Sequence, residues 1–359
     1  MNKIEKRQSN IEILRILLTI MVITVHFNSN GLTGGAFSVV KSGTIGSEFL
    51  YLLEALCVVC VNGFILITGY FSYKGKSIFL TKIGMLLFWV ISYNWIEYII
   101  SILLGKEQFN IITAIGKFVP NNWYVMIYIT LLIVSPYINI IINKLSKEKL
   151  INLTVILFLI FPVWNTVWGV LQTKSGINIA GISTVGIEGD QAGYTIVNFV
   201  FLYMVGALIS KWNIGDYRKI YDFLGYLICT LIIFLGKKIG LSMWDYSNCI
   251  VIVSSVFLFN FFRKTKLNLG RLDKYILLIS KACFGVYIIH TKAIIEGTFW
   301  EICTFLDMRD GSILAVVGNY SICILATFIV CVFIDSFYRF LLNPLLKKVE
   351  KRKFIIDVE

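Results

Sequence analysis

Long, continuous apolar segments limit most strongly how this chain can fold. Only short polar or basic stretches interrupt them. A helix needs roughly 20 apolar residues to cross the hydrocarbon core of a bilayer, whereas membrane strands alternate apolar and polar residues. The pattern therefore predicts an all-α, polytopic integral membrane protein with about ten transmembrane helices, at approximately 11–29, 49–71, 83–104, 122–142, 151–171, 194–210, 221–236, 247–262, 275–297 and 313–338.

Composition agrees with this class. Apolar residues make up 57% of the 359 residues and charged residues only 15%, against about 25% charged residues in soluble domains. A soluble α/β enzyme and a disordered chain are both excluded. The eight Cys lie mostly inside apolar segments, without the spacing of a disulfide framework. Cys57 and Cys60 lack the second half of a zinc site, so we expect packing roles and no metal.

The Lys and Arg residues predict the orientation. If ten spans cross the membrane, 23 of the 33 basic residues fall on one side and seven on the other. Cytoplasmic loops carry the excess of Lys and Arg, so both termini are expected to be cytoplasmic. Residues 1–342 would form the transmembrane domain and 343–359 a basic cytoplasmic tail. The net charge of +12 then orients the protein in an anionic bilayer, and no nucleic-acid partner is expected.

The first apolar segment contains three ionisable residues: Glu12, Arg15 and His26. Ionisable groups inside a membrane are costly and usually functional. Arg15 and His26 are eleven residues apart, which places them on nearly the same helical face, about 16 Å apart along the axis. Glu12 precedes Arg15 by three positions and can pair with it. The spacing predicts a polar track leading inward from the cytoplasm; the alternative is an interhelical hydrogen-bonding face.

Both histidines of the chain, His26 and His290, lie in apolar segments. Imidazole is the side chain best suited to general base catalysis near neutral pH. We predict that His26 is such a base. His290 either contributes to the same site or is a core imidazole whose hydrogen bonds are satisfied.

Basic and aromatic residues follow or open later segments. Lys74 and Lys82 lie at the predicted cytoplasmic mouth of the polar track, where they would hold a phosphate-bearing ligand or simply flank the span. Gly63 and Gly69 permit close helix approach. Further polar and aromatic candidates for substrate contact are Thr68, Tyr70, Trp123 and Tyr124, although the last two also suit an interfacial aromatic belt.

Four elements occur in order along the chain. Arg15 is followed, after ten residues, by His26; Thr68-Gly69-Tyr70 follows an aromatic-rich run; Trp123-Tyr124 opens a segment; and Phe284 to His290 reads FGVYIIH. Together they resemble the membrane acyltransferase-3 family, which acylates bacterial cell-surface polysaccharides. The resemblance covers nearly the whole chain. Thr68 stands where the family usually has Ser, and scattered Lys residues replace paired Arg residues after the second segment.

The resemblance implies an acyl-CoA-dependent O-acyltransferase of the bacterial plasma membrane. It would move an acyl group, which we expect to be acetyl, from cytoplasmic acetyl-CoA to a hydroxyl of an extracellular or lipid-linked polysaccharide, such as capsule or exopolysaccharide. The implied catalytic residues are His26, Arg15 and Glu12. Arg15, Lys74 and Lys82 would bind the donor, and the implied acceptor-binding residues are Thr68, Tyr70, Trp123, Tyr124 and His290.

Two other classes remain open. A multi-span transporter or exporter of a glycan or small solute would use the intramembrane Arg, His and Glu as a proton relay or substrate site. A membrane scaffold or sensor would not need Arg15 and His26 on one face. The sequence does not distinguish acetyl from succinyl, direct transfer from an acyl-enzyme, or one oligomeric state from another.

Overall fold

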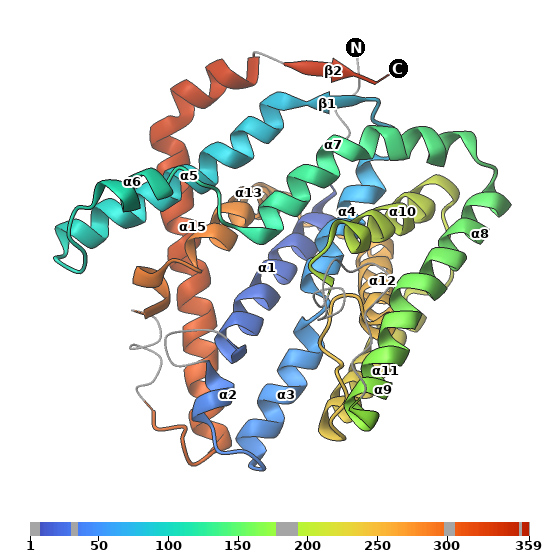
Figure 1. Cartoon of the computed structure of the whole chain (residues 1–359), viewed down its shortest axis with the longest axis horizontal. Coiled ribbons are helices and arrows are strands. Elements are labelled where there is room, and N and C mark those ends of the chain that lie inside the picture. Colours follow the sequence, from blue (N-terminus) through green and yellow to red (C-terminus); the bar gives the residue numbers. More distant parts are fainter. Residues whose placement is uncertain (1–7, 30–34, 177–192, 298–305, 352–353, 359) are drawn as a thin grey trace. The chain divides into compact units, whose positions relative to one another are not determined.

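The computed structural model describes residues 8–29, 35–176, 193–297, 306–351 and 354–358, and most of them are helical (Figure 1). The chain forms two compact units whose segments interleave along the sequence. Unit 1 consists of residues 1–25, 48–74 and 139–283, and unit 2 of residues 26–47, 75–138 and 284–359.

Unit 1 contains most of the helices. It holds the larger part of α1 (Ser9–Ser29), α3 (Ile45–Cys57) and α13 (Asp273–Ile289), and the end of α7 (Trp123–Lys144). Its other helices are α4 (Cys60–Ser72), α8 (Lys147–Phe158), α9 (Trp164–Ser175), α10 (Ile196–Trp212), α11 (Lys219–Lys238) and α12 (Cys249–Lys264), with a short 3₁₀ turn at Gly270–Leu272.

Glycines bring helices of unit 1 into close contact. A Cβ on Gly69 of α4 would overlap the carbonyl oxygen of Tyr203 in α10, and a Cβ on Gly63 would overlap the Leu18 side chain of α1. Small residues allow such backbone approach in membrane proteins, where lipid supplies little hydrophobic drive for helix association. The predicted role of Gly63 and Gly69 is confirmed.

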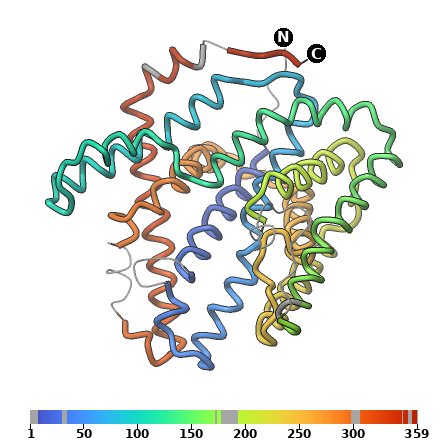
Figure 2. Tube along the Cα trace, viewed as in Figure 1, coloured from blue at the N-terminus to red at the C-terminus, as the bar shows by residue number. Residues whose placement is uncertain are grey.

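A π-helical turn at Leu159–Val163 joins α8 to α9. Figure 2 shows the chain passing from α8 through this turn into α9 without reversing direction. Pro162 lies in the turn, where its missing N–H removes one helical hydrogen bond. The Thr166 hydroxyl donates to the Pro162 carbonyl (2.7 Å) and accepts the Cys249 backbone N–H (2.8 Å). The turn is therefore anchored to the start of α12.

Unit 2 contains α2 (Ala36–Val39), α5 (Leu80–Leu103), α6 (Ile111–Gly116), most of α7 and α15 (Ile313–Lys351). Strands β1 (Ser77–Phe79) and β2 (Ile355–Asp357) pair antiparallel, with Ser77 opposite Asp357 (Figure 1). Because β1 directly precedes α5 and β2 follows α15, the start of α5 and the end of α15 lie at the same end of this unit.

All ten predicted segments overlap helices, although 49–71 is divided between α3 and α4, and α13 ends at Ile289 inside the predicted segment 275–297. Within the described residues, seven helices are long and apolar enough to cross a membrane, and α10 is a shorter apolar helix. The all-α, polytopic membrane fold is confirmed, whereas the count of ten spans and the cytoplasmic termini stay predictions. Helix α15 continues through Pro344 to Lys351, across the predicted boundary at 342/343, and that boundary also stays a prediction. Lys3, Lys6 and Arg7 lie outside the described residues.

Candidate functional site

The two histidines of the chain lie against each other in unit 2. His26 lies in the last turn of α1, and His290 directly follows α13. Nδ1 of His26 is 2.8 Å from Nε2 of His290. The rings stack with their centroids 4.9 Å apart and an interplanar angle of 24°. The fold thus joins two ionisable side chains that are 264 residues apart in sequence.

His290 is the more enclosed member of this pair. It is 5% exposed, whereas His26 is only partly buried. The second ring nitrogen of His290, Nδ1, lies 2.8 Å from the carbonyl oxygen of Val286, one helical turn earlier. Both nitrogens of His290 are therefore engaged within the protein.

A row of aromatic rings extends from His290. Its ring centroid lies 6.1 Å from that of Tyr287, which is 5.2 Å from that of Tyr124. Tyr124 stacks on Tyr128 at 5.8 Å, and the Lys82 ammonium lies 5.8 Å from the Tyr128 ring centroid. Lys82, Tyr124 and His290 were predicted site residues, and the structure connects them through rings within one unit.

Three residues of this cluster were not predicted as site residues: Asn122, Tyr128 and Tyr287. The Tyr287 hydroxyl donates to Oδ1 of Asn122 (3.1 Å), which also accepts the Val125 backbone N–H (3.1 Å). Tyr287 precedes His290 by three positions, so helical spacing alone would have placed both on one face. Trp123 is 37% exposed and packs edge-on against Tyr124.

The other predicted residues of α1 belong to unit 1. Glu12 is 4% exposed and accepts a hydrogen bond from the Ser280 hydroxyl of α13. Arg15 Nε is buried without a hydrogen-bond partner among the described residues. The packing of α1 on α13 thus supplies Glu12 with a buried donor, and the pairing of Glu12 with Arg15 stays a prediction.

Thr68 and Tyr70 also lie in unit 1. The Thr68 hydroxyl donates to the Phe64 carbonyl of its own helix (2.9 Å), and the Tyr70 ring packs against Phe259 at 5.3 Å. Lys74 is exposed, with its ammonium 5.5 Å from the Tyr73 ring centroid. These contacts do not test the expected roles, which are acceptor binding for Thr68 and Tyr70 and donor binding for Lys74, so the roles stay predictions.

Two further polar clusters in unit 2 pair opposite charges. Asp335 is fully buried and accepts hydrogen bonds from the Tyr93 hydroxyl (2.7 Å) and from Arg339 Nε (2.5 Å). Lys292 lies 3.7 Å from the Glu97 carboxylate. In both clusters opposite charges compensate each other, and the buried Asp335 carboxylate thus has the partner that a buried charge requires.

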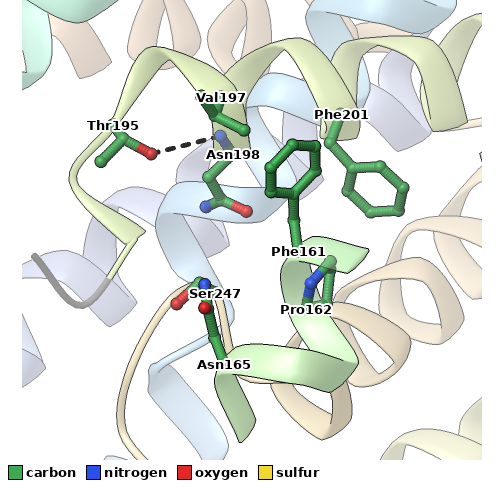
Figure 3. Close-up of a pocket in the computed structure, with 8 residues that line it drawn as sticks. All are labelled: Phe161, Pro162, Asn165, Thr195, Val197, Asn198, Phe201 and Ser247. Atoms are coloured by element: carbon green, nitrogen blue, oxygen red, sulfur yellow. Dashed lines mark hydrogen bonds between the residues drawn. The ribbon is translucent and has the colours of Figure 1, made fainter. Parts of the chain in front are cut away.

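The clearest pocket in unit 1 has no predicted site residue in its lining (Figure 3). Thr195 caps α10 beside it through the hydrogen bond to the Asn198 N–H that Figure 3 draws. The volume of this pocket is about 10 Å³, close to what one water molecule requires. It is too small to admit an acyl chain or a sugar. Its lining residues are Phe161, Pro162, Asn165, Thr195, Val197, Asn198, Phe201 and Ser247.

Within the described part of the chain, no cluster of three or more His, Cys, Asp or Glu side chains is arranged to hold a metal ion. The seven described cysteines are free, and six of them are buried. Cys303 lies outside the described residues.

Comparison with known proteins identifies the family. A family model described as an acyltransferase domain matches residues 8–336. No curated protein matches the chain, and no solved structure does. The family match includes the histidine pair, the aromatic row and every predicted site residue. The chain therefore belongs to the acyltransferase-3 family and is a membrane acyltransferase.

Proposed function

We propose that this protein transfers an acetyl group from cytoplasmic acetyl-CoA to a hydroxyl of an extracellular or lipid-linked polysaccharide. The observation that carries the proposal is the contact between His26 and His290 in a chain of an acyltransferase family. O-acyl transfer needs a base for the acceptor hydroxyl, and imidazole is suited to that role near neutral pH. His26 is partly open while its partner is enclosed, which favours His26 as the group that meets substrate.

In the proposed reaction His26 accepts the proton of the acceptor hydroxyl while the hydroxyl oxygen bonds to the thioester carbonyl carbon. The carbon–sulfur bond then breaks, and the proton passes from His26 to the departing thiolate, so that ester and free CoA are formed. An acyl-His26 intermediate is the alternative route. Both routes require an unprotonated nitrogen on His26.

The donor is proposed to bind through Arg15, Lys74 and Lys82. Lys74 and Lys82 are exposed, and neither forms an ion pair with another described residue, so both ammonium groups suit CoA phosphates. Arg15 Nε is buried without a partner in the described residues, a costly state that a ligand acceptor would relieve. These side chains fit an anionic, phosphate-bearing donor.

The acceptor is proposed to contact the aromatic side chains. Tyr124 and Trp123 lie in the row that leads to His290, and aromatic rings offer a large amphipathic contact surface. Thr68 and Tyr70 are proposed as further contacts; Tyr70 is the better hydrogen-bond donor, since the Thr68 hydroxyl is engaged by Phe64.

The proposed location is the bacterial plasma membrane with cytoplasmic termini. The pairing of β1 with β2 supports this topology, because it brings the segment after Lys74 and the C-terminal tail to one end of unit 2. Both segments are rich in Lys and Arg, as cytoplasmic segments are.

The test uses purified full-length protein in liposomes, radiolabelled acetyl-CoA and a polysaccharide acceptor. We expect release of free CoA thiol together with label in the polysaccharide. The His26→Ala variant should lose both signals, and Tyr137→Ala, at an exposed position of α7, should retain them. Movement of unmodified glycan across the liposome membrane with no thiol release would instead identify a transporter and contradict the proposal.

A further inference from the structure

We propose that His290 is a positioning residue that fixes the tautomer of His26. In this arrangement Nδ1 of His26 carries the hydrogen and Nε2 of His26 carries the lone pair that acts as the base. The inference rests on the proposed function for its catalytic meaning, but the hydrogen positions follow from contacts within unit 2 alone.

The Val286 carbonyl oxygen determines which nitrogen of His290 carries the hydrogen. A carbonyl oxygen only accepts hydrogen bonds, and Nδ1 of His290 lies 2.8 Å from it. Nδ1 of His290 is therefore the donor. In a neutral imidazole one nitrogen is protonated and the other is not, so Nε2 of His290 is an acceptor.

The hydrogen of His26 follows from its contact with His290. Its Nδ1 lies 2.8 Å from Nε2 of His290. Because that Nε2 is an acceptor, Nδ1 of His26 must donate. A neutral His26 then has its lone pair on Nε2, which is the nitrogen not engaged with His290.

The assignment requires a neutral His290. His290 is 5% exposed, and it forms no ion pair with a described carboxylate. A charged group in such a position is costly unless it is paired. A protonated His290 would donate from Nε2 to Nδ1 of His26, and a neutral His26 would then carry its own hydrogen on Nε2 and could not act as a base there.

The contact also serves the later part of the reaction. When Nε2 of His26 takes the hydroxyl proton, the ring becomes an imidazolium whose Nδ1–H still donates to His290. Hydrogen bonds from charged donors are roughly twice as strong as neutral ones. The pair therefore stabilises His26 more after proton transfer than before it, and His290 itself stays neutral throughout.

Two replacements separate positioning from packing. In His290→Gln the side-chain oxygen offers an acceptor near the place of Nε2, whereas His290→Met fills similar space without one. We expect His290→Met to lower kcat by about 100-fold or more, the scale of general base catalysis, with little change in KM. His290→Gln should remain within about 10-fold of the wild-type kcat, since one acceptor replaces the other.

Nitrogen NMR reads the tautomer directly. With selectively ¹⁵N-labelled histidine the spectrum contains two imidazoles, because the chain has two His, and His290→Gln leaves His26 alone. We expect both rings of the wild type to be protonated at Nδ1, His26 to keep this form in His290→Gln, and His26 to lose it in His290→Met.

Protonation of His26 at Nε2 in the neutral wild-type protein would overturn the inference. So would an unchanged kcat and tautomer in His290→Met, or loss of the Nδ1–H form in His290→Gln. If the wild type shows the expected tautomers but neither it nor any variant releases CoA, the proposed function fails while the tautomer assignment stands. The two failures are therefore distinguishable.

Discussion

Gly69 of α4 lies so close to Tyr203 of α10 that a Cβ at residue 69 would overlap the Tyr203 carbonyl oxygen. The contact is reciprocal, because a Cβ on Gly206 of α10 would overlap the Leu66 carbonyl oxygen of α4. Each helix thus has a glycine that lies directly against the backbone of the other. This close approach lets van der Waals packing hold the helices together in lipid.

Replacing Gly69 with Ala should destabilise the protein. The added methyl group forces α4 and α10 apart, and overpacking of this kind costs about 1–3 kcal/mol. Thermal unfolding in detergent measures the effect, and we expect a lower midpoint. Gly84→Ala on α5 is the matched control, since no atom lies within 4 Å of its Cβ position and Ala favours a helix over Gly by about 1 kcal/mol. Equal midpoints for the two variants would refute the contact.

Arg15→Met should separate activity from stability. The change removes a buried Nε that lacks a described partner, so we expect the unfolding midpoint to stay the same or rise. Acyl transfer should fall by about 10- to 100-fold, the equivalent of one lost charged hydrogen bond to the donor.

Lys281→Met is the control for Arg15→Met, because Lys281 is an exposed cation on α13. It should leave CoA release unchanged. An Arg15→Met protein with wild-type activity would remove Arg15 from donor binding. A large loss of stability in Arg15→Met would instead indicate that Arg15 has a structural role.

Tyr124→Ala should weaken acceptor binding. Tyr124 contacts both Tyr128 and Tyr287 in the row that leads to His290. Loss of the ring should raise KM for the polysaccharide by about 10-fold, which corresponds to 1.4 kcal/mol, and leave KM for acetyl-CoA unchanged. Tyr124→Phe keeps the ring and should behave like the wild type, as should Tyr137→Ala. An increase confined to the donor KM would reverse the proposed assignment.

The helices were largely predictable because each apolar segment is long enough to form one. Other features were not. The segment after α5 folds back so that the Tyr98 hydroxyl contacts the backbone of Asn110, and no periodicity in the sequence indicates this. Helix α15 continues through Pro344, where propensity alone favours an end. The pairing of β1 with β2 joins segments far apart in the chain.

The sequence indicated which residues belong to the candidate site better than it indicated which contacts they make. The scarcity of histidine and its position in apolar segments pointed to His26 and His290, but only the fold brings them within 2.8 Å. Local spacing suggested Glu12 with Arg15, but it could not indicate the hydrogen bond that Glu12 accepts from the Ser280 hydroxyl, 268 residues away. Tertiary packing decides such partners because a buried carboxylate takes the donor that the neighbouring helix supplies.

The central claim is that this protein acylates a surface polysaccharide and that His26 is the base. Its most direct test is mass analysis of the surface polysaccharide in a deletion strain complemented with wild type, His26→Ala or Tyr137→Ala, at matched membrane levels. The account predicts that the deletion strain lacks an acetyl substituent, that wild type and Tyr137→Ala restore it, and that His26→Ala does not. Full acetylation with His26→Ala, or an unchanged polysaccharide in the deletion strain, would contradict it.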